Sequence, residues 1–137
     1  MKLGVSEVLE KAAQVTDRNE RIRYLQLNAS TPLNTVLQGV FDPRIKWLLP
    51  EGEPPYKPND LVDQQNSLFT ECRKMYLFVE NGNNNLKPLR REALFIQMLE
   101  RLDPKDAKLM VSVKDKHMPY PGITEDIVRE AFPGLLP

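Results

Sequence analysis

The sequence contains very few residues of the types that cross-link a fold or carry catalysis: one cysteine, one histidine and one tryptophan. A single cysteine, Cys72, excludes an internal disulfide and a cysteine-based zinc site. Because Cys72 stands among apolar residues, we expect it to be a small buried hydrophobe. The only histidine, His117, forms no triad with Cys72 on this evidence, and we expect it at the surface of a loop.

Long apolar runs are also missing. The N-terminal segment of residues 1–14 carries charges at helical intervals, so the sequence predicts neither a secretory signal nor a membrane span. We therefore expect a cytoplasmic protein without a membrane partner. Its 41% hydrophobic and 28% charged residues are typical of an ordinary soluble protein, and its length fits one domain covering residues 1–137.

No excess of either charge is present, because 19 basic and 19 acidic residues cancel. A dedicated nucleic-acid binder usually has a strongly basic balance, so a net charge of zero counts against that class. Locally, acids gather at residues 51–63, while the basic residues of the second half gather in two groups, Lys87 with Arg90 and Arg91, and Lys105 with Lys108, Lys114 and Lys116. Two interpretations stay open: a one-sided basic face, or charges scattered over solvated helix exteriors.

Motifs of known catalytic sites are absent. The chain has no Gly-x-x-x-x-Gly-Lys-Ser/Thr loop, no Gly-x-Ser-x-Gly elbow and no His-Glu-x-x-His helix. Asp103 and Asp106 have the spacing of a metal-binding or acid–base pair, but capping and the helix dipole explain acids at a helix start. We expect no enzyme, no cofactor and no metal, and we assign no catalytic residue.

Helix start signals recur along the whole chain. Apolar residues at helical spacing follow candidate caps, and no segment alternates with period two for long enough to compete as a strand. We expect helices to begin at Ser6, Asp17, Thr31–Pro32, Asp60 or Asp63, Pro88, Asp103–Pro104 and Thr124. The sequence therefore predicts an all-α bundle of six to seven short helices. The segment Leu94–Leu102 is apolar nearly all round, which predicts a central, buried helix.

A Pro-rich segment interrupts the helices. Residues 42–58 contain five prolines around the only tryptophan, so we expect an ordered loop at 43–58 with room for one helical turn at 45–49. Its apolar residues are too many for a solvated tether. Two roles stay open: a structural strap, or a binding element whose anchors are Trp47, Leu48 and Tyr56.

The last residues of the chain add a resemblance. Residues 94–137, LFIQMLERLDPKDAKLMVSVKDKHMPYPGITEDIVREAFPGLLP, resemble the end of the helical DNA-binding domain that precedes the catalytic core in ATP-dependent DNA ligases of tailed phages and archaea. Lys114-Asp115 stands where that family has Arg-Asp, Gly122-Ile123 stands for its Gly-Val, and Phe132-Pro133-Gly134-Leu135 is its closing tetrapeptide. The departure is the segment 116–121, which lengthens the loop that lies along the minor groove in ligases.

This resemblance implies a helical fold and duplex DNA as the partner. It implies no catalysis, because the Lys-x-Asp-Gly motif on which ligases form their enzyme-adenylate is missing. Separately, FDPRIKWLLPEGEPPYKPN, VKDK and EAFP resemble a family of small tailed-phage proteins without an assigned activity. That similarity implies a phage gene product acting in a bacterial cytoplasm.

Two functional hypotheses follow. In the first, the protein is a non-catalytic DNA-binding module, and solvent-facing cations meet duplex phosphates through one face made by Arg90, Arg91, Lys105, Lys108, Lys114 and Lys116. In the second, it is a protein-interaction module, for example a host-takeover or defence-blocking factor, and a partner docks on Trp47, Leu48 and Tyr56.

Overall fold

Helices make up the regular secondary structure of this computed structural model, which describes residues 3–61, 65 and 67–137. The prediction of an all-α fold of six to seven short helices is confirmed. An isolated antiparallel bridge pairs Trp47 with Val79, and no strand forms within residues 3–61, 65 and 67–137. In chain order the helices are α1 (Val5–Gln14), α2 (Arg18–Leu27), α3 (Thr31–Phe41), α4 (Leu68–Glu71), the 3-10 helix η2 (Cys72–Phe78), α5 (Pro88–Arg101), α6 (Pro104–Lys114) and α7 (Glu125–Ala131).

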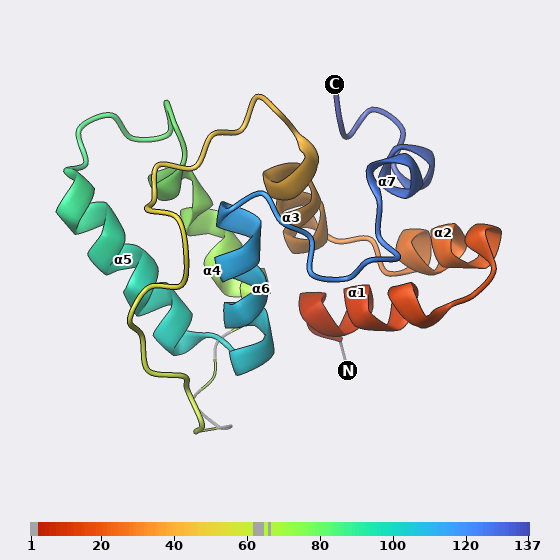
Figure 1. Cartoon of the computed structure of the whole chain (residues 1–137), viewed down its shortest axis with the longest axis horizontal. Helices are drawn as coiled ribbons and strands as arrows, with labels where there is room; N and C mark the ends of the chain where they lie inside the picture. Colours follow the sequence, from red (N-terminus) through yellow and green to blue (C-terminus); the bar gives the residue numbers. More distant parts are fainter. Residues whose placement is uncertain (1–2, 62–64, 66) are drawn as a thin grey trace.

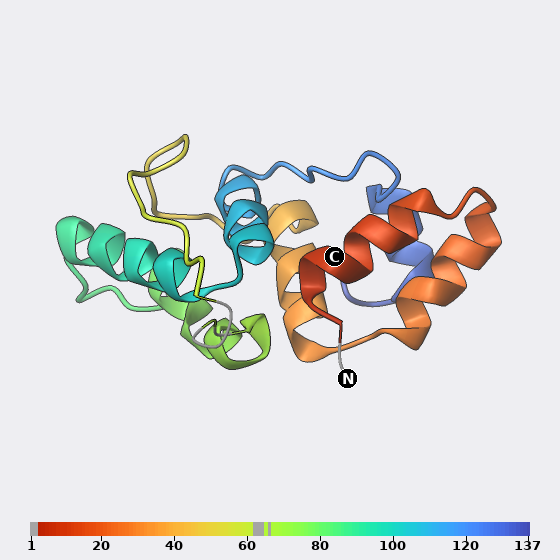
Figure 2. The same cartoon turned by 90° about the horizontal axis from the view of Figure 1, so that it is seen from below.

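The helices are arranged along an elongated body with α6 in its middle. α6 packs against α1, α3 and α5, whereas α7 packs on α2. Both views place α5 at one end of the molecule and α2 at the other (Figures 1 and 2). Each helix contributes buried apolar side chains to one continuous core cluster.

The prediction that the Leu94–Leu102 helix lies at the centre is wrong. α5 buries Phe95, Met98 and Leu99 on one side, and Leu89 on the same helix is 81% exposed. The central element is α6, whose Ala107, Leu109, Met110 and Val113 are buried. Arg90, Gln97 and Glu100 form a solvent-facing side of α5, so this helix needs a neighbour on one face only.

Three of the predicted caps are confirmed. Asp17, Asp103 and Thr124 accept hydrogen bonds from the backbone amides of Asn19, Lys105 and Ile127, at 3.1, 2.7 and 3.4 Å respectively. These bonds satisfy amides that have no partner inside the first turn of their helices.

Two predicted starts are shifted. α1 begins after Gly4, and Ser6 lies inside it, where its amide donates to Asp106 Oδ1 at 3.0 Å. The cap of α3 is Ser30 rather than Thr31, because Ser30 Oγ accepts from the Leu33 amide at 3.2 Å.

The long helix predicted between residue 60 and Val79 is wrong in its first half. Asp60 lies in irregular chain, Asp63 lies outside the described residues, and regular helix begins only at Leu68. It tightens into η2 and ends at Phe78, whose carbonyl accepts from the Leu48 amide at 2.8 Å. Asn81 then has a left-handed φ of 69°, as expected where Asn81-Gly82 stops a helix.

Candidate functional site

The Pro-rich segment Asp42–Pro58, which we call the strap, is fastened to the helices from its start. Trp47 Nε1 donates to the Gly39 carbonyl of α3 at 2.9 Å. Their approach is so close that a Cβ on Gly39 would lie 2.8 Å from Trp47 Cζ2. The expected helical turn at 45–49 does not form, because the backbone at Lys46 and Leu48 pairs with Glu80 and Phe78 instead.

The middle of the strap is held by the C-terminal end of α6. Lys114 Nζ donates to the Pro50 carbonyl at 2.9 Å and pairs with Asp115 Oδ1 at 2.8 Å. Asp115 Oδ2 accepts from the Gly52 amide at 3.1 Å. Gly52 has a φ of +92°, a conformation that glycine adopts without strain, and it turns the chain there.

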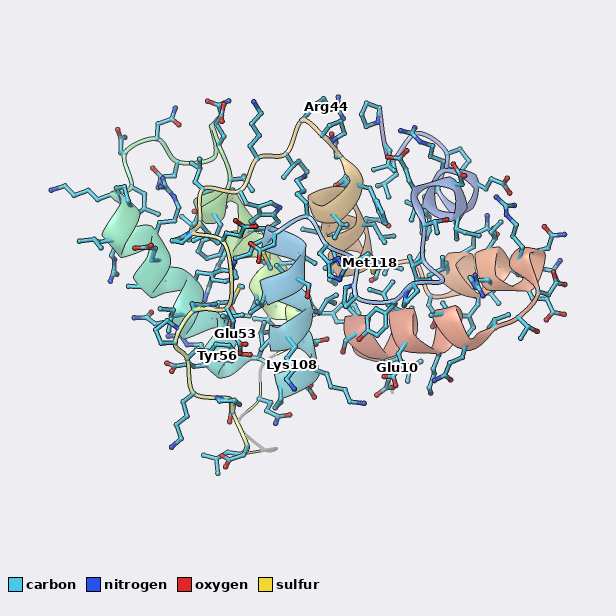
Figure 3. The ribbon with its side chains drawn as sticks, viewed as in Figure 1. Glu10, Arg44, Glu53, Tyr56, Lys108 and Met118 are labelled. Carbon is cyan, nitrogen blue, oxygen red and sulfur yellow. The ribbon has the colours of Figure 1, made fainter. Side chains whose placement is uncertain are left out.

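The last part of the strap lies against α5. The Lys57 amide donates to Glu100 Oε2 at 2.8 Å. Tyr56 is half-buried against the core, and burial raises the pKa of its phenol, with the negative charge of Glu53 acting in the same direction. Figure 3 shows Glu53 and Tyr56 close together on the strap.

A groove of about 400 Å³, which we call the strap groove, opens between the strap and α5. Phe95 and Ile96 of α5 face Leu49, Pro54 and Pro55 of the strap. The lining also includes Pro50, Gly52, the Lys114 ammonium and the carboxylates of Glu51, Glu53 and Glu92.

The anchors predicted for a protein partner are mostly turned inward. Trp47 and Tyr56 are half-buried and pack against the core, and Leu48 is 38% exposed. The aromatic residues of this segment therefore hold the strap on the helices. Sequence patterning alone could not distinguish this role from an exposed binding element, because both need an apolar residue among prolines.

The six predicted DNA-binding residues do not form one face. Arg91 is buried and donates to the carbonyls of Leu77 at 3.0 Å, Asn83 at 3.4 Å and Leu86 at 3.0 Å, so it holds the turn before α5. Arg90 is exposed in the first turn of α5. The helix begins at the outer end of the molecule (Figure 1). That end is about 16 Å along the helix from Arg101, next to which α6 begins.

The expectation that Lys114 faces solvent is wrong. Its side chain is only 2% exposed, because the strap covers it and supplies the Pro50 carbonyl as a partner. Lys116 is exposed as a residue, but its Nζ donates to the Asp42 carbonyl at 2.7 Å. Partial burial lowers the pKa of Lys116, and the negative charge of Asp42 acts in the opposite direction. Both lysines therefore connect the end of α6 to the strap.

Lys105 and Lys108 remain as exposed cations on α6. They line a second groove, of about 320 Å³, which we call the α6 groove and which also includes Glu10, Leu109, Ser112, Pro119 and Tyr120. Lys105 Nζ lies 3.5 Å from Glu10 Oε2, and both side chains are substantially exposed. Figure 3 shows Lys108 on α6 and Glu10 on α1 along the same side of the molecule.

His117 is exposed in the loop after α6, as expected. Cys72 is only half-buried, and this partial burial raises the pKa of its thiol. Within residues 3–61, 65 and 67–137, no three or more His, Cys, Asp or Glu side chains lie together as a metal site would require. In the same residues, no helix has the length and apolar character needed to cross a membrane.

Comparison with known proteins identifies one family. A model described as "Family of unknown function (DUF6433)" matches residues 8–119, which is most of the chain. The chain therefore belongs to that family. The match includes every residue that lines the strap groove and all but Tyr120 of the α6 groove. No curated protein and no solved structure matches the chain.

Proposed function

We propose that this chain, as a member of that family, is a non-catalytic helical module that binds duplex DNA through the α6 groove. The observation that carries the proposal is the position of Lys105 and Lys108. Both are exposed on one side of α6, and the loop residues Pro119 and Tyr120 line the same groove.

The resemblance to the DNA-binding domain of ATP-dependent ligases supports this choice. The loop that lies along the minor groove in those enzymes corresponds here to residues 114–122, which include Pro119 and Tyr120. In the closing tetrapeptide, Gly134 has a φ of +87°, which explains why a glycine is needed at that position. The proposed surface is thus smaller than the six-residue face expected from the sequence and includes a loop wall.

Binding through this surface is electrostatic and independent of base sequence. Lysine ammoniums contact phosphates and release condensed counterions, which positions a protein on DNA without reading bases. The Lys105–Glu10 pair does not prevent this. Exposed pairs of this kind are worth roughly 0 to 1 kcal/mol, so a phosphate can replace Glu10. Because the net charge of the protein is zero, we expect its binding to DNA to be weak and to be abolished readily by salt.

The test is the double change Lys105→Glu with Lys108→Glu, measured by fluorescence anisotropy on a labelled duplex across a range of salt concentrations. We expect weaker binding to all sequences alike. The slope of log affinity against log salt should flatten by about two units, roughly one for each lost phosphate contact.

The matched control is Lys87→Glu with Arg90→Glu, which makes the same change in charge at exposed positions near the start of α5. We expect it to leave most of the binding intact. If the control weakens DNA binding as much as the test variant does, the affinity depends on net charge and not on the α6 groove, and the proposal is wrong. If the parent protein fails to bind duplex DNA at low salt, the proposal is wrong. Lys114→Glu is unsuitable, because it would break the contact between α6 and the strap.

A protein-interaction module is the second candidate, favoured by the strap groove. The resemblance to small tailed-phage proteins supports a phage gene product acting in a bacterial cytoplasm, and a host-takeover or defence-blocking factor would be one such product. In that case the partner would meet the groove beneath the strap rather than Trp47 and Tyr56, whose rings pack on the core.

A further inference from the structure

The strap groove combines apolar walls with a rim of three carboxylates. Phe95 and Ile96 form the α5 wall, and Pro54 and Pro55 form the strap wall. Glu51 and Glu53 come from the strap, and Glu92 comes from α5, so the three carboxylates are contributed by two separate elements.

The one cation in the lining does not neutralise this rim. Lys114 Nζ already pairs with Asp115 and donates to the Pro50 carbonyl, and its side chain is buried. The charge of Lys114 is therefore balanced by Asp115. Three glutamates from the lining are left to attract an incoming cation.

The groove is also held in shape before any partner arrives. Lys114 and Asp115 bind the strap at Pro50 and Gly52, and Glu100 binds it at Lys57. Residues 51–55 therefore lie between fixed points. A preformed groove loses less conformational entropy on binding than a free loop would.

We propose that the strap groove binds a basic segment of a partner protein, in which arginine or lysine residues alternate with apolar ones. The aliphatic stems pack on Ile96 and on Pro54 and Pro55 of the strap, and the cationic heads reach the rim glutamates. Long cationic side chains suit such a surface, because they cover apolar area while their heads stay hydrated. The volume, about 400 Å³, lies at the small end of ligand pockets, so it holds one or two side chains.

This inference goes beyond DNA binding and does not rest on it. The strap groove is lined by the strap, α5 and Lys114, whereas the α6 groove is lined by α1, α6 and the loop after it. The glutamates of the strap groove repel phosphates, so this surface takes a basic protein segment and excludes DNA. The two sites can be inactivated separately.

The test is an NMR titration of the 15N-labelled full chain with a blocked nonapeptide of alternating arginine and leucine. We expect saturable, salt-sensitive shifts confined to the backbone amides of residues 49–53 and 91–97. Glu53→Gln with Glu92→Gln should lower the affinity for the peptide about fivefold or more, since each partly exposed charge contact contributes modestly to the binding free energy. The same variant should bind duplex DNA at least as well as the parent.

The matched control is Glu20→Gln with Glu125→Gln, which removes the same charge from α2 and α7 at the far end of the molecule (Figure 1). It should bind the peptide as the parent does. A glutamate-for-arginine version of the peptide should not bind. Spermidine that bound as tightly as the peptide would identify a small polycation site instead. Shifts centred elsewhere, or no shift at millimolar peptide, would also overturn the proposal.

Discussion

Several cations that the sequence presents as surface charges are structural residues. Arg91 donates to carbonyls at the end of η2 and in the turn before α5, and Lys114 donates to a carbonyl of the strap. A buried carbonyl without a donor is costly, and a long cationic side chain can reach it from a neighbouring helix. In this protein, therefore, the type of a residue alone does not tell whether a lysine or arginine is exposed to bind phosphate or is buried and holds the backbone.

Asp42 is the residue at which α3 ends and the strap begins. Its carboxylate accepts from the Arg44 side chain at 3.1 and 3.0 Å and from the Arg44 amide at 2.9 Å. These bonds, and chiefly those from the Arg44 side chain, lower the pKa of Asp42 below its ordinary value of 3.8. Because the folded pKa lies below the unfolded one, the ionised carboxylate stabilises the fold at neutral pH.

Asp42→Asn should therefore destabilise the protein at pH 7. The contribution of Asp42 is complete above the unfolded value of 3.8 and is lost as pH falls through the lower folded value. We expect the difference in free energy of unfolding between parent and variant to narrow progressively below about pH 4. Urea denaturation at a series of pH values measures it, and a difference that stayed constant down to acid pH would contradict the prediction.

Among the elements, α1 has its first turn completed by another helix. Gly4 offers no side chain to cap α1, and Asp106 of α6 accepts from the Ser6 amide in its place. Burial raises the pKa of Asp106, while the bonds from Ser6 act in the opposite direction. Asp103 and Asp106 thus have separate structural tasks, since Asp103 caps α6 and Asp106 caps α1.

The two sides of α5 should respond differently to the same substitution. Leu99 is fully buried and Leu89 is 81% exposed on the same helix. Leu99→Ala should lower the free energy of unfolding by about 2 to 5 kcal/mol, because it loses the transfer free energy of the removed atoms and leaves a cavity. Leu89→Ala should change stability by less than about 0.5 kcal/mol. Thermal melting of both variants compares them, and equal effects would mean that α5 does not pack as described.

At the scale of the whole molecule, the strap and the helices share one core. Helices α1 to α7 bury residues in a single cluster, and the half-buried Trp47, Leu49 and Tyr56 of the strap pack against it. Trp47 joins the strap to α3, and Lys114 joins it to α6. We therefore expect the strap to unfold together with the helices.

Trp47, the only tryptophan, makes this testable. Its fluorescence should be blue-shifted in the native protein, and its urea transition should coincide with the far-UV circular dichroism transition. Gly39→Ala should shift the emission to the red and destabilise by about 1 to 3 kcal/mol, because the added Cβ overlaps the indole. A fluorescence change that preceded the loss of helix would show that the strap detaches independently.

Local sequence patterns were enough to predict the all-α class, the confirmed caps at Asp17, Asp103 and Thr124, and the turn at Asn81-Gly82. These features depend on neighbours a few residues apart, where capping and periodicity act. Which helix is central and which cationic side chains face solvent depend on packing between distant segments. Lys114 meets Pro50 across 64 residues, and Asp106 meets Ser6 across 100. No local pattern encodes such contacts, because burial depends on what packs against a side chain.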